Sequence, residues 1–263
     1  MEYNESADER TTLHNLAQEA FAAFAEAQQE VPEVVVDPAI PILFFGDLDA
    51  YRTSPLKIVT AALNPSKMEF PSDKPFERFP AAAGLRDVHT SKDFASYREA
   101  LVSYFYPNQA PYRRWFSSLE QVLTGASASF YPGARNTALH TDVCSPVPTD
   151  PTWSNLATQR PVLLQGGRPL WHDLIRYLRP DVIVISVARS HVDQIDFAPG
   201  GPWSTLHTVE RTNPYAVQQR RIHISDDHYS LLVFGAAMQT PFGGITDEDK
   251  RHVGESIERE TIA

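Results

Sequence analysis

Apolar residues recur along the chain with two different spacings, and each spacing predicts a different kind of element. Near the N-terminus they recur every three or four residues from Leu13 to Phe24, as on one face of a helix. Ser6 and Glu9 precede this stretch with the spacing of a capping box, and Pro32 follows it. We therefore expect an amphipathic helix that docks on the main body of the protein, with a partner protein as the alternative docking surface.

Short apolar runs that end at turn residues predict buried strands. Such runs suit strands covered on both faces, as in a parallel sheet. The predicted buried strands are Ile58–Leu63, Ala138–Cys144, Asp181–Ala188 and Leu231–Gly235. Apolar and polar residues alternate in Leu206–Arg211 and Arg221–Ser225, which predicts two further strands, antiparallel at an edge of the sheet.

Helical spacing returns between the predicted strands. Ser91 is expected to cap one helix, Tyr112 opens a second that Gly125 closes, and a last helix begins at Thr246. Gly166–Gly167 are expected to break the chain before a helix over Pro169–Leu178. Strands that alternate with helices predict an α/β protein, with a three-layer α/β/α arrangement around a mostly parallel sheet.

Length and composition are those of a globular protein. The 263 residues allow one large domain with an extension, and we expect an acidic N-terminal helix (residues 1–36) packed on an α/β domain (residues 37–263). No apolar run approaches the roughly 20 residues of a membrane span, and the N-terminus does not resemble a signal peptide. Cys144 is the only cysteine, so no intrachain disulfide forms. We expect a cytoplasmic monomer that does not bind membranes.

The net charge of −10 argues at first against nucleic acid as a partner. Its distribution changes this picture, because residues 1–37 carry nine acidic residues and a single arginine. The remaining chain has 24 acidic and 22 basic residues, so it is close to neutral, and 18 of the 23 basic residues are arginine. Arginine suits bidentate contact with phosphate, so a local phosphate-binding face remains compatible with the composition.

Polar residues follow two of the predicted strands where ligands usually bind. The first strand stops at Asn64-Pro65-Ser66, because proline cannot continue the hydrogen-bonded ladder. Open parallel sheets bind ligands beyond the carboxyl ends of their strands, so Asn64 is a candidate functional residue. Asp142 lies at or near the carboxyl end of another predicted strand, Ala138–Cys144, which also leads into a proline-rich loop. The alternatives are an ordinary Asn-Pro turn and an aspartate that bonds its own loop.

Other common motifs are missing from the sequence. It contains no GxGxxG, Walker A, GxSxG or HExxH pattern. His140 and Asp142 are residue types that bind metals, as are His223 and the cluster Asp226–His228, but their spacing defines no coordination geometry. We therefore expect neither a metal nor a cofactor.

Taken together, these motifs resemble the uracil-DNA glycosylase superfamily. The resemblance is carried by Ala62-Leu63-Asn64-Pro65-Ser66, by the strand over Pro180–Ala188, and by Leu231–Phe242 as the last strand with its loop. It would cover the chain from about Ile40 to the C-terminal helix. The asparagine makes it nearer to the mismatch-specific thymine/uracil glycosylases than to the branch with aspartate, while the last motif lacks the His-Pro-Ser of many members.

This resemblance implies a monofunctional DNA glycosylase that flips a base out of the helix and hydrolyses its N-glycosidic bond. Asn64 would orient the attacking water. The DNA contacts it implies are Pro65, Ser66 and Lys67 in the first motif, and Met238, Gln239 and Thr240 in the last loop, where Met238-Gln239 would fill the gap left by the base. An aromatic residue after the first motif would stack on the base, and Phe70, Phe76 and Phe79 are the candidates.

Asp142 would be the residue that reads the base. An ionised carboxylate only accepts hydrogen bonds, so we expect a target with an exocyclic amino group, such as a modified cytosine. Two alternatives remain open. A module of the same fold would recognise DNA or a modified nucleotide without cleaving it, and a doubly wound enzyme would act on small nucleotides or sugar phosphates.

Overall fold

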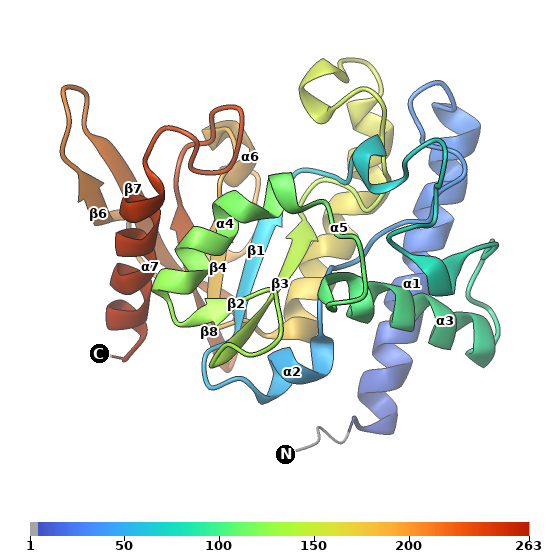
Figure 1. The fold of residues 1–263 in the computed structure, drawn as a ribbon, viewed down its shortest axis with the longest axis horizontal. Coiled ribbons are helices and arrows are strands. Elements are labelled where there is room, and N and C mark those ends of the chain that lie inside the picture. The colour runs from blue at the N-terminus through green and yellow to red at the C-terminus, as the bar shows by residue number, and fades with distance from the viewer. Residues whose placement is uncertain (1–4, 263) are drawn as a thin grey trace. The chain divides into compact units, whose positions relative to one another are not determined.

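Helices and strands alternate along the chain in the computed structural model, which describes residues 5–262 (Figure 1). The helices are α1 (Ala7–Glu30), α2 (Leu48–Thr53), α3 (Ser91–Val102), α4 (Arg113–Gly125), α5 (Arg160–Leu178), α6 (Arg189–Val192) and α7 (Asp247–Ile262). The strands are β1 (Ile58–Ala62), β2 (Ala128–Ser129), β3 (Asn136–Asp142), β4 (Val182–Ile185), β5 (Ala198–Pro199), β6 (Ser204–Val209), β7 (Tyr215–Ser225) and β8 (His228–Phe234). Short 3-10 turns cover Lys67–Glu69, Pro80–Ala82, Ser103–Phe105 and Trp153–Asn155.

The strands of the described residues form one mixed, mostly parallel central sheet. Its order is β2-β3-β1-β4-β8-β7-β5, with β6 also paired to β7. The pairs β1–β4 and β4–β8 are parallel, whereas β7 runs antiparallel to its three neighbours. Every residue of β1 and of β4 is buried, as the unbroken apolar runs predict. The expected α/β class is therefore confirmed.

The chain divides into two compact units. The first unit comprises Met1–Leu48, Ala62–Pro111 and His140–Leu178, and the second comprises Asp49–Ala61, Tyr112–Leu139 and Arg179–Ala263. The expected division of the chain at residue 36 stays a prediction, and residues 1–4 of that segment lie outside the described residues. In the structure α1 belongs to the first unit.

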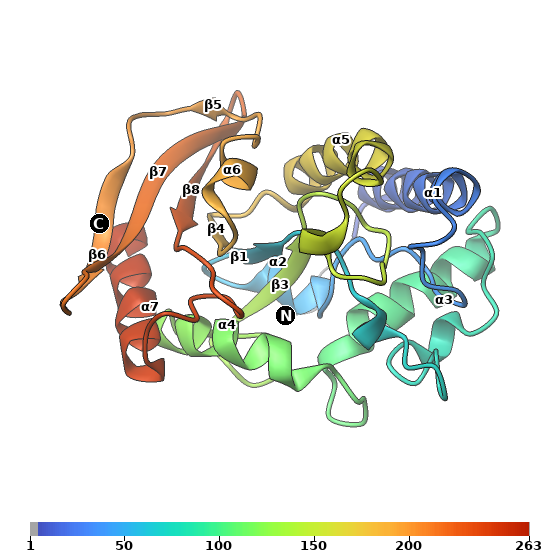
Figure 2. The same ribbon diagram turned by 90° about the horizontal axis from the view of Figure 1, so that it is seen from above.

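Within the first unit, α1 lies along α5 (Figures 1 and 2). Ser6 and Glu9 form the predicted capping box, in which the Glu9 backbone N–H donates to Ser6 Oγ at 3.2 Å and the Ser6 N–H donates to Glu9 Oε2 at 2.9 Å. The predicted apolar stripe is buried from Leu13 to Phe24, and the helix ends before Pro32. The predicted amphipathic helix is thus confirmed.

Helix α5 corrects one expectation. Gly166–Gly167 do not break the chain, because the helix runs through them from Arg160 to Leu178. A Cβ on Gly167 would overlap the carbonyl oxygen of Cys144 and lie 2.5 Å from Ser145 Cα. A Cβ on Gly166 would lie 3.1 Å from the Cβ of Ala23 in α1. The two glycines allow close packing of the helix rather than a turn.

Local polar side chains begin two further helices. The helix predicted from Ser91 is confirmed as α3, but its N-cap is Thr90, whose Oγ1 accepts from the Asp93 backbone N–H at 3.1 Å. Before α7, the Asp249 N–H donates to Thr246 Oγ1 at 3.2 Å and the Thr246 N–H donates to Asp249 Oδ2 at 2.9 Å. This second pair is the predicted capping box.

In the second unit, two helices pack in close contact and three strands form an antiparallel edge. Helices α4 and α7 lie side by side in both ribbon views (Figures 1 and 2). A Cβ on Gly254 would overlap the Val122 carbonyl oxygen, which explains a glycine inside α7. The two predicted edge strands are present as β6 and β7, but β7 begins at Tyr215 instead of Arg221. Its pairing with both β6 and β8 stabilises the longer strand.

Candidate functional site

The candidate site in the first unit is built around a buried segment, residues 140–149. Every residue of this segment is buried, so its backbone groups must find partners inside the protein. Backbone N–H groups of Val143 and Cys144 donate to the carbonyls of Ala62 and Leu63, each at 2.9 Å. The chain leaving β1 is thereby held against this segment up to Asn64.

Asn64 closes the connection between the two loops. Its Nδ2 donates to Thr149 Oγ1 at 2.8 Å, to the Pro65 carbonyl at 2.9 Å and to the Val147 carbonyl at 3.2 Å. The Thr149 N–H in turn donates to the Pro65 carbonyl at 3.1 Å. Asn64 itself is half-buried. The amide nitrogen is thus fully occupied within the protein.

This arrangement determines which way the Asn64 amide points. Two of the three acceptors are backbone carbonyls, which cannot donate. In the opposite orientation Asn64 Oδ1 would face the carbonyl oxygens of Pro65 and Val147 with no hydrogen between them. Among the described residues, none donates to Asn64 Oδ1, and this oxygen is not buried. The carbonyl oxygen of the side chain is therefore free to accept a hydrogen bond from a water or a ligand.

The residues that follow Asn64 form a short, tightly bonded turn. Pro65 is buried, and Ser66 caps the 3-10 turn by accepting from the Met68 N–H at 3.2 Å. Lys67 Nζ donates to Asp150 Oδ2 at 2.6 Å, and both side chains are more than half exposed. An exposed pair of this kind contributes little to stability, so Lys67 can exchange its carboxylate partner for a phosphate at small cost.

Asp142 lies in a buried polar cluster whose other acidic member, Glu69, was not among the predicted site residues. Tyr104 Oη donates to Glu69 Oε2 at 2.5 Å, and Arg78 Nε lies 3.9 Å from the same oxygen. Arg78 Nε and Nη1 are buried and have no hydrogen-bond partner among the described residues. Periodicity does not identify Glu69, since a single acid among aromatic residues has no distinctive spacing.

Burial changes the protonation of both acids. It raises the pKa of Glu69 to about 7, against the opposing effects of Tyr104 and Arg78. It also raises the pKa of Asp142 well above its ordinary value, with a further contribution from the charge of Glu69. Both shifts favour the protonated form, in which a carboxyl donates one hydrogen bond as well as accepting.

The aromatic candidates for base stacking lie among the core residues of the first unit. Phe70 and Phe79 are 3% and 0% exposed, and their rings stack with centroids 5.2 Å apart. Phe76 is half-buried and meets Phe70 edge to face at 6.1 Å. The ring of Tyr104 lies 5.2 Å from that of Phe79. In this structure Phe70 and Phe79 contact neighbouring rings, so stacking on a base would require them to separate.

His140, two residues before Asp142 in β3, has a buried ring. Burial lowers the pKa of His140 to about 3, so the ring is neutral. Its neighbours are aromatic, with the Phe45 ring centroid at 5.6 Å. The described residues contain no group of three or more His, Cys, Asp or Glu side chains that could hold a metal ion.

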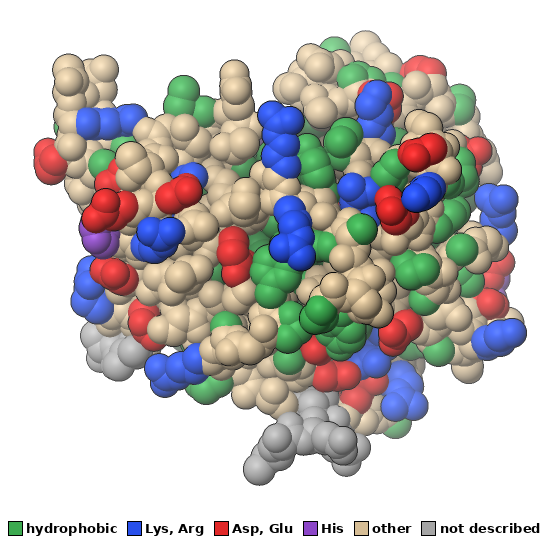
Figure 3. Space-filling model, viewed as in Figure 1, with side chains coloured by type: hydrophobic (Ala, Val, Ile, Leu, Met, Phe, Trp, Pro, Cys, Tyr) green, Lys and Arg blue, Asp and Glu red, His purple; other side chains and the backbone are tan. Residues whose placement is uncertain are grey.

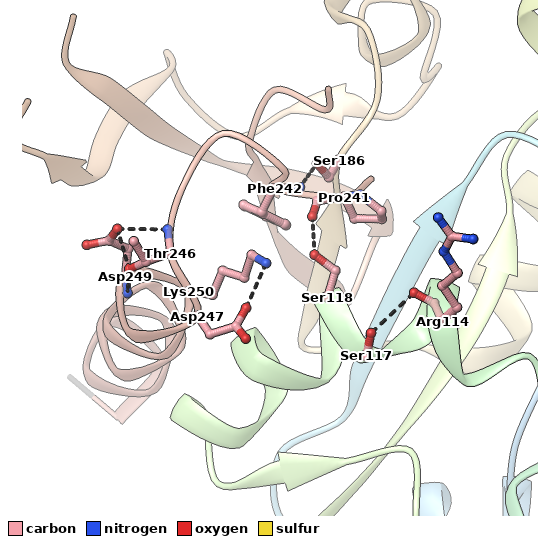
Figure 4. A network of polar contacts seen from close by, with 10 residues as sticks. All are labelled: Arg114, Ser117, Ser118, Ser186, Pro241, Phe242, Thr246, Asp247, Asp249 and Lys250. Carbon is pink, nitrogen blue, oxygen red and sulfur yellow. Dashed lines mark hydrogen bonds and ion pairs between the residues drawn. The ribbon is translucent and has the colours of Figure 1, made fainter. Parts of the chain in front are cut away.

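The last predicted DNA contacts lie in the second unit, on a loop anchored at both ends. Met238 is 71% exposed at the loop, and Gln239 is also exposed. Phe242 is fully buried, and its N–H donates to Ser186 Oγ at 2.8 Å (Figure 4). Ser118 Oγ of α4 donates to the Pro241 carbonyl at 2.5 Å. These bonds hold the loop in place while its apolar tip faces solvent.

The backbone of this loop is tightly bent. Phe242 adopts a φ of +52°, an uncommon conformation for a residue with a Cβ. Tyr215 Oη fixes the start of the loop by donating to the Ala236 carbonyl at 2.6 Å, and the Gly243 N–H donates to the Thr240 carbonyl at 3.0 Å. Thr240 therefore belongs to the turn that presents Met238.

One face of the molecule carries mixed charge (Figure 3). Acidic and basic side chains are interspersed on the face shown in Figure 3. None of the helices in residues 5–262 has the length and apolar character needed to cross a membrane.

Comparison with models of known protein families finds no match for this chain, and no curated protein matches it.

Proposed function

We propose that the protein is a DNA glycosylase that removes an unusual or modified base, with a three-layer fold like that of the uracil-DNA glycosylases. The observation that carries this proposal is the orientation of Asn64. Its NH2 group is held by Val147, Pro65 and Thr149, so Oδ1 is left as an acceptor beyond the end of β1. An acceptor held in this way suits the orientation of a water molecule.

In the proposed reaction the water adds to C1′ of the sugar as the bond between C1′ and the base nitrogen breaks. The departing base takes the bonding electrons, and the sugar passes through an oxocarbenium-like state. Asn64 Oδ1 accepts one hydrogen bond from the water. This bond orients a lone pair of the water oxygen toward C1′. A neutral amide is not a strong base, so the proton passes to solvent after the addition. Positioning by Asn64 and stabilisation of the leaving base would supply the rate enhancement.

Asp142 would stabilise and read the base. A protonated carboxyl offers one donor and one acceptor, as an asparagine side chain does. It would donate to an oxygen or nitrogen of the leaving base as negative charge develops there. In its protonated form Asp142 would not require an amino group on the base, whereas in its ionised form it would, so modified cytosine is one target among others to be tested.

The test is an excision assay on DNA duplexes and single strands that carry a panel of natural and modified bases, read as alkali-labile sites. We expect abasic sites at one class of base, and at least a 100-fold lower rate for Asn64→Ala with little change in DNA affinity. The matched control is Asn108→Ala, because Asn108 is exposed and its side chain makes no hydrogen bond to any residue from 5 to 262. Equal rates for the two variants would exclude Asn64 as the water-positioning residue.

A second candidate function is a binding module of the same fold that recognises DNA or a modified nucleotide without cleaving it. The observation that favours it is the same set of hydrogen bonds, because Asn64 also serves to tie two loops together. The packed rings of Phe70 and Phe79 also favour the binding module, because both rings are buried against each other. Salt-dependent DNA binding by a wild-type protein that forms no abasic site at any base would support the module and reject the glycosylase.

A further inference from the structure

Two arginines and a tryptophan meet in the second unit. Arg189 begins α6, Arg220 lies in β7, and Trp203 directly precedes β6. The Cζ atoms of Arg189 and Arg220 lie 4.4 Å and 4.7 Å from the centroid of the Trp203 ring. Two like charges therefore share one aromatic ring, an arrangement that favours an anion nearby.

The charge of this arginine pair is only partly compensated. Arg189 Nε donates to Asp193 Oδ1 at 3.0 Å, and Arg189 Nη1 donates to Gln218 Oε1 at 2.5 Å. Arg220 has no ion pair and no hydrogen bond within the described residues, and its Nε is buried. Burial and the charge of Arg189 lower the pKa of Arg220. A donor that is buried without a partner is costly, and an anionic ligand would remove that cost.

Arg189 and the Met238 loop follow the ends of the neighbouring strands β4 and β8, and Arg220 in β7 pairs with Leu232, two residues before the end of β8. Ile185 and Phe234, the last residues of these two strands, are paired in register. Ser186, which follows β4, bonds the Met238 loop at Phe242, as Figure 4 shows, and Arg189 comes three residues later. The Arg189 guanidinium also lies 5.2 Å from the Phe234 ring. Arg189 and the Met238 loop thus both lie beyond the carboxyl ends of the neighbouring strands β4 and β8.

We propose that Arg189 and Arg220 bind a phosphodiester group of the DNA strand, beside the point where Met238 contacts it. The proposal rests on the proposed function, since it takes DNA as the ligand. A guanidinium binds phosphate with two parallel hydrogen bonds, and stacking on Trp203 holds the arginines in place for this contact. The contact is to the backbone, so it adds affinity without selecting the base.

The test compares oligonucleotide affinities across a range of salt concentrations. We expect Arg220→Gln to weaken binding about tenfold at low salt and to reduce the slope of log affinity against log salt by about 1. Arg221→Gln is the matched control, because it removes the same charge from the next residue of β7, which is exposed. We expect less than a twofold effect from it. Circular dichroism spectra check that each variant is folded.

A second variant acts in the opposite direction and carries little risk of unfolding. Asp193 is exposed and neutralises Arg189, so Asp193→Asn should tighten DNA binding two- to fivefold and steepen the salt dependence. Its control is Asp226→Asn, an equal charge change at an exposed turn.

Three results would overturn the proposal. The first is equal affinities for Arg220→Gln and Arg221→Gln, and the second is equal affinities for Asp193→Asn and Asp226→Asn. The third is weakened binding of a deoxynucleoside monophosphate by Arg220→Gln while its oligonucleotide binding stays undiminished, which would assign the site to a free nucleotide. The proposed glycosylase activity is tested by a separate measurement. If the protein binds DNA but forms no abasic sites in it, the proposed activity is rejected while the phosphate contact is not.

Discussion

At the scale of single residues, Asn64 has a structural and a proposed chemical role on the two sides of one amide. Its nitrogen ties the Asn64-Pro65-Ser66 loop to residues 147–149, and its oxygen is free. Thr149 links the two roles, because its Oγ1 accepts from Asn64 and donates to the Pro151 carbonyl at 3.0 Å. A change at Thr149 should therefore affect both the orientation of Asn64 and the stability of the loop.

Thr149→Val keeps the shape of the side chain but removes both hydrogen bonds. We expect it to lower the free energy of unfolding by about 1–3 kcal/mol, measured by urea denaturation. The proposed excision rate should fall by roughly 10- to 100-fold, because Asn64 loses one of the groups that position it. Thr208→Val on the exposed face of β6 is the control and should change neither quantity. An unchanged excision rate in a less stable Thr149→Val protein would separate Thr149 from catalysis.

Glu69 should make stability depend on pH. Its pKa of about 7 in the folded protein exceeds the ordinary value of 4.5, so folding favours its protonated form. This contribution to stability is present below pH 4.5 and is lost as the pH rises through 7. It amounts to at most about 3 kcal/mol.

Glu69→Gln should flatten the pH dependence of stability between pH 4.5 and 8. Glutamine stays neutral, so the difference in unfolding free energy between the two proteins should shift in favour of the variant as the pH rises. Asp142, His140 and Arg78 are present in both proteins, and removing the charge of Glu69 should also lower the pKa of Asp142 in the variant. Urea denaturation at several pH values measures this difference. Parallel curves for the two proteins would contradict the raised pKa.

At the scale of elements, glycines decide how closely helices approach their neighbours. Gly167 brings α5 against the backbone of Cys144 and Ser145, at the start of the loop that follows β3. A Cβ on Gly166, its neighbour in the helix, would meet Ala23, with the Cβ at 3.1 Å and the Cα at 3.8 Å. The two positions are adjacent in sequence and have the same intrinsic helix propensity, so they form a matched pair.

Gly167→Ala should destabilise the protein by about 1–3 kcal/mol, because its Cβ would overlap backbone atoms that cannot move aside independently. Gly166→Ala should change stability little, because the gain of up to about 1 kcal/mol in helix propensity is offset by the close contact with Ala23. Thermal or urea denaturation of both variants provides the comparison. Equal effects at the two positions would show that α5 does not pack on Cys144 as described.

The Met238 loop is an element whose backbone is anchored while its tip is exposed. If Met238 fills the space of a flipped base, Met238→Ala should slow excision roughly tenfold from duplex DNA. Single-stranded DNA is the internal control, since no stacked pair has to be replaced there. Equal slowing on both substrates would assign Met238 to general DNA contact instead of insertion.

At the scale of the whole molecule, charge limits how DNA can be bound. The acidic residues concentrate in the segment 1–37, and the remaining chain is nearly neutral. Few phosphates can then be neutralised at once. If two or three are contacted, affinity should fall roughly 10- to 40-fold between 50 and 200 mM salt. Fluorescence anisotropy across this range measures the slope. A drop of 1,000-fold or more would indicate a much larger basic surface than the sequence provides.

Local patterns account for the parts of the fold that the sequence predicts well. Ser6 with Glu9 and Thr246 with Asp249 carry their capping partners within three residues, so their helix ends can be read directly. Gly166–Gly167 predicts a break where the structure has a helix, because glycine suits turns and also close helix contacts. The choice between these depends on residues about 20 positions away in sequence, Cys144 and Ser145.

The candidate site shows the same division between local and tertiary information. The sequence by itself determined two buried strands, one with Asn64 just beyond its end and one with Asp142 near its end, because apolar runs and prolines act locally. Tertiary structure alone decided that Val147 and Thr149 orient the Asn64 amide and that burial raises the pKa of Asp142. It also brought Glu69, Tyr104 and Arg78 together and set Arg189 beside Arg220. Hydrogen bonds and desolvation act through space, so they depend on neighbours whose identity no local pattern contains.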